Sequence, residues 1–90
     1  MYKLTYRKAV LKDLKNTPQE TRELIDKRID QLEINPRPEQ CKKLHGYLKL
    51  WRIKQGDYRI VYNIDDEKNL VNVLAVGHRK DIYRMLNQLF

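Results

Sequence analysis

The stretch LWRIKQGDYRIVYNI, residues 50–64, constrains the fold of this chain more than any other segment. Two runs of β-branched, aromatic and apolar residues flank a polar segment at residues 55–57, a pattern typical of a β-hairpin whose turn contains glycine. Successive side chains of a strand point to opposite faces of a sheet. In the first strand, Arg52 and Lys54 therefore share one face and Trp51 lies on the other.

The second strand adds another cation to the face that carries Arg52 and Lys54. Burying the apolar faces of both strands together requires an even number of loop residues, most simply a turn at Gln55-Gly56. This register predicts that Arg52 lies directly across from Arg59, with Lys54 one step away. Three cations so close together repel one another, so the pattern favours a site that binds an anion.

The net charge of the whole chain agrees with an anionic partner. The sequence has 19 Lys and Arg residues against 12 Asp and Glu residues, a formal net charge of +7. Residues 1–40 carry nine basic against seven acidic residues, whereas residues 41–90 carry ten against five. We therefore expect polyanions such as nucleic acids as partners, bound mainly by the second half of the chain.

Cysteine and histidine usage argues against a metal site or a disulfide. Cys41 is the only cysteine, and neither His45 nor His78 is spaced to form a ligand pair with it. The sequence also has no apolar run long enough for a signal peptide or a membrane span. We expect a reduced, cytoplasmic protein without metal, cofactor or membrane contact.

The remaining hydrophobic pattern predicts a single α+β domain over residues 1–90. Helix stripes are expected around Val10, Leu11 and Leu14 and, after a start at Thr17-Pro18, around Leu24 and Ile25. The predicted elements are a strand at 2–6, helices at 7–16 and 17–34, the hairpin at 50–64, a strand at 70–76 and a helix at 81–89. The nearly unbroken apolar run at 70–76 indicates a central strand. We expect an N-terminal strand, an antiparallel two-helix hairpin packed on a mainly antiparallel four-stranded sheet, and a C-terminal helix.

Sequential pairing of the last three strands would bring a second polar group to the hairpin cations. This group is His78, Arg79 and Tyr83, where the last strand leads into the final helix. RNA can be cleaved by its own 2′-hydroxyl if a base removes the hydroxyl proton, cations stabilise the phosphate, and an acid protonates the leaving oxygen. A lysine crowded by arginines has a lowered pKa and could be that base. Two plainer interpretations stay open, since exposed Arg and Lys often only solvate a sheet and a histidine such as His78 often only caps a turn.

The chain resembles RelE-type toxins of the RelE/ParE toxin-antitoxin superfamily over nearly its whole length. The residues that carry the resemblance are Asn35-Pro36, Leu44-His45-Gly46, Trp51-Arg52-Ile53-Lys54, Gly56-Asp57-Tyr58-Arg59-Ile60-Val61-Tyr62 and Val76-Gly77-His78-Arg79-Lys80-Asp81-Ile82-Tyr83. This resemblance implies a ribosome-dependent mRNA interferase, an endoribonuclease that inhibits translation. It would cut the codon in the ribosomal A site through metal-free attack by the 2′-hydroxyl.

The resemblance also implies roles for individual residues. Lys54 and Arg59 would help to activate the nucleophile and stabilise the transition state, Arg79 would bind the scissile phosphate, and Tyr83 would stack on a base or transfer a proton. The family has lysine where this chain has Arg52, which can hold a phosphate but is a poor base because it stays protonated. His78 replaces a basic residue of some relatives, and we expect it to bind RNA or phosphate.

The implied partners are a cognate antitoxin, the ribosome and mRNA, with operator DNA reached only through the antitoxin complex. Two other functions remain open. A ParE-like DNA gyrase inhibitor would share the fold without needing the four proposed catalytic residues. A non-catalytic nucleic-acid-binding module would lose only affinity, in a salt-dependent manner, when Lys54 or Tyr83 is replaced.

Overall fold

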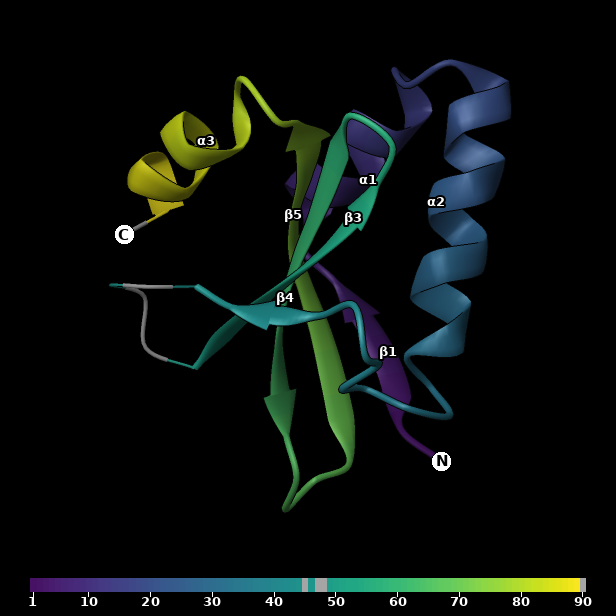
Figure 1. The fold of residues 1–90 in the computed structure, drawn as a ribbon, viewed down its shortest axis with the longest axis vertical. Helices are drawn as coiled ribbons and strands as arrows, with labels where there is room; N and C mark the ends of the chain where they lie inside the picture. Colours follow the sequence, from purple (N-terminus) through teal and green to yellow (C-terminus); the bar gives the residue numbers. More distant parts are fainter. Residues whose placement is uncertain (45, 47–48, 90) are drawn as a thin grey trace.

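The computed structural model describes residues 1–44, 46 and 49–89, and its ribbon is drawn in Figure 1. The elements in chain order are β1 (Lys3–Tyr6), α1 (Lys8–Lys15), α2 (Gln19–Gln31), β2 (Lys42–Lys43), β3 (Leu50–Gln55), β4 (Tyr58–Asp65), β5 (Leu70–His78) and α3 (Ile82–Leu89). The predicted α+β class is therefore confirmed. No helix in the described part of the chain is long and apolar enough to cross a membrane.

The sheet has five strands in the order β1-β5-β4-β3-β2, one more than we expected. The additional strand is β2, which pairs antiparallel with β3 through Lys42 opposite Arg52 and Lys43 opposite Trp51. Two residues are too few to produce a recognisable alternation in a sequence. Every pairing is antiparallel except that of β1 with β5, which is parallel.

Helices cover the sheet on both faces, with α1 and α2 on one side and α3 on the other (Figure 1). The larger core cluster joins Val10, Ile25 and Ile29 of the first two helices to Ile60 and Val73 of the sheet. The smaller cluster, on the other face, contains Leu44, Leu50, Val61, Ala75, Ile82 and Leu86. Strand β5 lies between β1 and β4 and contributes residues to both clusters, as its apolar sequence predicted.

Each predicted helix stripe is narrower in the structure than in the sequence pattern. Val10 and Ile25 are buried, whereas their neighbours Leu11 and Leu24 are exposed. Adjacent residues of a helix point about 100° apart, so packing against a flat sheet can bury only one of each pair. The start of α2 also differs, because its first residue is Gln19 and the Thr17 hydroxyl donates to the carbonyl of Asp13 instead of capping the helix.

The hairpin register was predicted with the correct faces but the wrong turn. The turn is Gly56-Asp57, which places Lys54 opposite Arg59 and Val61 opposite Arg52. Gly56 has a φ of 58°. A two-residue hairpin turn with glycine first favours this left-handed conformation, which other residues adopt with difficulty. The shift is two residues, so each side chain stays on its predicted face.

Candidate functional site: a basic surface beside the last helix

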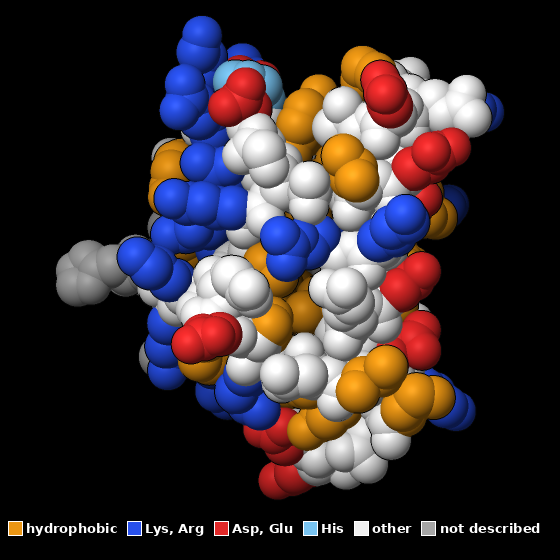
Figure 2. All heavy atoms as spheres, turned by 45° about the vertical axis from the view of Figure 1, so that its right-hand side comes forward, with side chains coloured by type: hydrophobic (Ala, Val, Ile, Leu, Met, Phe, Trp, Pro, Cys, Tyr) orange, Lys and Arg blue, Asp and Glu red, His pale blue; other side chains and the backbone are white. Residues whose placement is uncertain are grey.

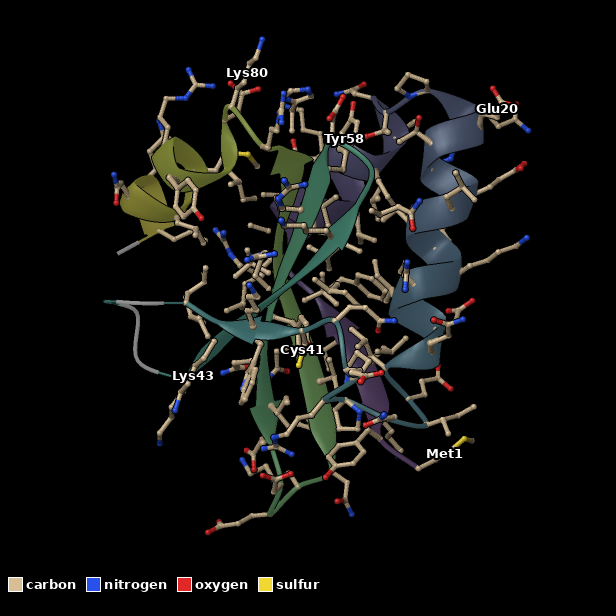
Figure 3. All side chains as sticks on the ribbon, in the orientation of Figure 1. Met1, Glu20, Cys41, Lys43, Tyr58 and Lys80 are labelled. Carbon is tan, nitrogen blue, oxygen red and sulfur yellow. The ribbon has the colours of Figure 1, made fainter. Side chains whose placement is uncertain are left out.

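Strands β3 and β4 present three cations on the face that α3 covers only in part. Arg52 and Lys54 flank the buried Ile53 on β3, and Arg59 lies opposite Lys54 on β4. Leu50 and Val61, on the same face, pack with Ile82 and Leu86 of α3. We call Arg52, Lys54 and Arg59 the basic cluster. In Figure 3, nitrogen-tipped side chains project from the β3–β4 hairpin into the space beside α3.

The cations of the basic cluster change the acid strength of Lys54. The Lys54 side chain is exposed, and the positive charge of Arg52, followed by that of Arg59, lowers its pKa. Losing a proton relieves this repulsion, so the neutral amine is easier to form here than on an isolated lysine. A neutral amine can accept a proton, which the permanently charged guanidinium groups cannot do.

The pairing of β4 with β5 brings Arg79 to the end of the sheet that carries Lys54 and Arg59. Tyr58 lies opposite His78 and Arg59 lies opposite Gly77, so the sequential pairing of β4 and β5 that we predicted is present. Figure 3 shows Tyr58 and Lys80 at this end of the molecule. The backbone N–H of Arg79 donates to the carbonyl oxygen of Asp57 at 2.7 Å.

Tyr83 lies in the first turn of α3, with 54% of its surface exposed. The helix packs closely on β5 because residue 77 is glycine: a Cβ there would lie 2.6 Å from the Sδ atom of Met85. This close packing places the first turn of α3 over the sheet face that carries Arg59. The ring of Tyr83 is therefore available to a ligand bound on that face.

His78 is the one predicted site residue that turns away from the basic cluster. Its ring meets Tyr58 edge-on at 5.8 Å, and Tyr58 packs against the core cluster of α1 and α2. The Nδ1 atom of His78 accepts a hydrogen bond from the backbone N–H of Lys80 at 3.2 Å. His78 thus stabilises the turn after β5, on the opposite face from Lys54. His45, part of the sequence resemblance, lies outside the described residues.

Asp57, which the sequence pattern did not predict as a site residue, lies beside Arg79. Its Oδ1 atom lies 3.8 Å from the Nε atom of Arg79, in addition to the backbone hydrogen bond. The sequence feature that could have indicated this role is the position of Asp57, an acidic residue between the cations Lys54 and Arg59. Asp57 lies beside Arg79 because the turn is at Gly56-Asp57, a position that the sequence pattern did not determine.

Charges are distributed unevenly over the surface that Figure 2 shows. Lys and Arg side chains form a nearly continuous strip along the left edge of this view, and Asp and Glu side chains gather along the right edge. On the described residues, no group of three or more His, Cys, Asp or Glu side chains is arranged to hold a metal ion. The arrangement is suited to holding a phosphate chain and to moving protons.

A family model described as ParE toxin of the type II toxin-antitoxin system parDE matches residues 4–83. Among curated relatives, the mRNA interferase toxin RelE of Escherichia coli is 33% identical over 81 residues, covering 88% of this chain and 84% of the relative. Toxin RelE3 of Methanocaldococcus jannaschii is 32% identical over 85 residues, covering 90% and 94%.

Solved structures show the same fold. The chain aligns with the toxin in the E. coli RelBE toxin-antitoxin complex with a TM-score of 0.77 and 32% identity, covering 87% of this chain and 96% of that one. For the archaeal RelE-RelB complex from Pyrococcus horikoshii, the TM-score is 0.77 and the identity 28%, with 87% and 94% covered. Each of these structures is described as a complex of the RelE chain with RelB.

Proposed function

This chain belongs to the RelE/ParE superfamily of type II toxins, and we propose that it is a RelE-type mRNA interferase neutralised by a cognate antitoxin. The observation that carries the proposal is the facing pair Lys54 and Arg59, with Arg52 beside them and the pKa of Lys54 lowered. This arrangement supplies both a base and fixed positive charge on one exposed surface. Its substrate would be mRNA in the ribosomal A site.

The proposed reaction is an internal transfer of the phosphodiester. Neutral Lys54 removes the proton of the 2′-hydroxyl, whose oxygen then forms a bond to phosphorus while the bond to the 5′-oxygen breaks. Arg59 and Arg79 stabilise the negative charge that develops on the phosphoryl oxygens, and Arg52 holds a neighbouring phosphate. The leaving 5′-oxygen takes up a proton from water, and the Lys54 ammonium later returns its proton to the solvent. The products carry a 2′,3′-cyclic phosphate and a 5′-hydroxyl.

Tyr83 and His78 complete the proposed site with different roles. Tyr83 is exposed on α3 and is assigned to stacking on a base of the codon, which would hold the scissile bond in line. His78 lies on the other sheet face beside Tyr58, so we assign it to binding RNA or phosphate beyond the scissile bond.

The proposed antitoxin would bind where positive charge and α3 lie together. Charge complementarity favours an acidic segment over the basic cluster. A groove of about 590 Å³ also runs along β5 between α1 and α3, lined by residues that include Lys12, Leu74, Met85 and Leu89. Contact with operator DNA would occur only through the complex with the antitoxin.

The experiment that tests this function is primer-extension mapping of an mRNA while it is translated in a cell-free system. Wild-type protein is compared with a Lys54→Ala, Arg79→Ala double variant. A Lys15→Ala, Lys27→Ala variant is the matched control, since it removes the same charge from exposed positions on α1 and α2. We expect cuts within A-site codons from the wild type and the control, and none from the double variant.

A second candidate function, inhibition of DNA gyrase, follows from the description of the matching family model as a ParE toxin. Intact translation together with gyrase-dependent DNA breaks would favour it over the interferase. Uniform, salt-dependent RNA binding without any cut would instead favour a non-catalytic nucleic-acid-binding module.

A further inference from the structure

The β3–β4 turn contacts both arginines that we assign to the scissile phosphate. On one side, the carbonyl oxygen of Asp57 accepts the backbone N–H of Arg79 at 2.7 Å, and the Asp57 carboxylate lies 3.8 Å from the Nε atom of that residue. On the other side, the Nη1 atom of Arg59 donates to the carbonyl oxygens of Gly56 at 2.9 Å and Tyr58 at 3.0 Å. The turn therefore contacts two guanidinium groups, one from β4 and one from the residue that follows β5.

The carboxylate of Asp57 faces the Nε atom of Arg79, and this affects how Arg79 can bind a phosphate. The approach of the Asp57 carboxylate to Arg79 is through Nε, at 3.8 Å, and not through a bidentate pairing with the two Nη nitrogens at hydrogen-bond distance. A guanidinium group binds phosphate best through two parallel N–H donors. Contact through Nε limits rotation of the group while its Nη donors stay available to a ligand.

We propose that Asp57 is a positioning residue, which orients the guanidinium of Arg79 toward the scissile phosphate. This inference rests on the proposed interferase function and adds to it a residue outside the basic cluster. Asp57 brings a negative charge to the end of the sheet where Arg59 and Arg79 meet. Before RNA binds, this charge reduces the repulsion between them that would otherwise separate their side chains.

The length and the exposure of the Asp57–Arg79 contact indicate whether Asp57 affects folding stability or the rate of cleavage. The side chains of Arg79 and Asp57 are 58% and 67% exposed, and 3.8 Å is longer than a hydrogen bond. An exposed ion pair of this kind contributes little to folding stability. Its effect is therefore expected in the rate of the chemical step, where a small misplacement of a charged group is costly.

The kinetic consequence differs from that of a lost binding contact. Asp57 also competes with phosphate for Arg79, so removing its charge does not weaken RNA binding. We expect Asp57→Asn to lower kcat by roughly tenfold while KM stays the same or falls. Asparagine is common in tight turns, so this variant keeps the hairpin.

The test uses ribosomes programmed with one defined A-site codon and measures kcat, KM and the melting temperature. Asp57→Glu keeps the carboxylate and should recover part of kcat. Glu67→Gln is the matched control, because it removes one exposed negative charge from the β4–β5 turn at the other end of the hairpin. Its kinetic constants should equal those of the wild type.

Two outcomes would overturn the proposal: an unchanged kcat in Asp57→Asn, or equal losses in Asp57→Asn and Glu67→Gln. A second measurement separates this inference from the proposed function. The exchange of the Arg79 Nε–H with water, followed by ¹⁵N NMR of the free protein, should become faster in Asp57→Asn and stay unchanged in Glu67→Gln. If the wild type cut no mRNA, the interferase function would fail, and this exchange rate would still show whether Asp57 orients Arg79.

Discussion

Lys54 lies directly across from Arg59 on neighbouring antiparallel strands, and the arginine guanidinium donates to the carbonyl oxygens of Gly56 in the hairpin turn and Tyr58 at the start of β4. Cations facing each other in a sheet destabilise it unless an anion or the loss of a proton relieves the repulsion. Here the repulsion lowers the pKa of Lys54 and favours binding of an anion. In the proposed mechanism, this pair supplies two requirements of RNA cleavage, a base and fixed positive charge.

The activity of the protein should depend on pH through Lys54. Only its neutral form can accept a proton, so the rate rises as pH approaches its pKa. Arg52 is the largest cause of the lowered pKa. Arg52→Gln should raise the pKa of Lys54 and move the ascending limb of the kcat/KM profile to higher pH, whereas Lys27→Gln on α2 should leave the limb in place. A limb that does not move in Arg52→Gln would exclude Lys54 as the base.

Replacing Arg79 should abolish most of the cleavage. A donor that stabilises charge developing in a transition state commonly contributes about 10²-fold or more to the rate. We expect Arg79→Ala to lower the single-turnover rate of cleavage on programmed ribosomes by at least about 10²-fold, with ribosome binding largely kept. Lys80→Ala, at the exposed neighbouring position, is the control. Unchanged cleavage would remove Arg79 from the mechanism.

Tyr83 should act through its ring. Stacking of an aromatic side chain on a base contributes about 1–3 kcal/mol, and Tyr83 is more than half exposed on α3. Tyr83→Phe should therefore keep most of the cleavage activity, and Tyr83→Ala should lower it by roughly tenfold. An equal loss in both variants, measured in the same assay, would show that the hydroxyl transfers a proton instead.

A buried hydrogen bond joins the loop after α2 to the sheet. The hydroxyl of Tyr62, a fully buried residue of β4, donates to the carbonyl oxygen of Pro36 at 2.8 Å. Tyr62→Phe leaves this buried acceptor unpaired, so the free energy of unfolding should fall by about 1–2 kcal/mol. Urea denaturation measures the change. Tyr6→Phe, at a partly exposed ring on β1, should alter stability much less.

The cognate antitoxin should cover the basic cluster or α3. Hydrogen–deuterium exchange on the toxin, alone and with its antitoxin, should show protection in β3, β4 or α3. Protection limited to the outer faces of α1 and α2 would contradict this prediction. Raising the salt concentration should weaken the complex, because charge complementarity contributes to it.

Much of the site could be predicted because its pattern is local. Alternation along a strand depends on each residue and its immediate neighbours. The faces of Arg52, Lys54 and Arg59 were therefore correct, although the turn was misplaced by one residue and the cross-strand pairing by two. The sequential pairing of β3, β4 and β5 also brought Arg79 to the hairpin as expected. Burial of whole apolar runs is likewise a local property, and it identified β5 as an interior strand.

The rest depended on contacts between segments distant in sequence. Two-residue turns at residues 55–56 and 56–57 both place the apolar side chains of the hairpin on one face. The positive φ of Gly56 suits the turn at 56–57, which is the one observed. That choice placed Asp57 against Arg79 and turned His78 toward Tyr58, away from the basic cluster. The sequence by itself determined which side chains share a face, because the alternation is built into the strand. Only the tertiary structure decided which of them meet, because register and the packing of α3 are set by the whole core.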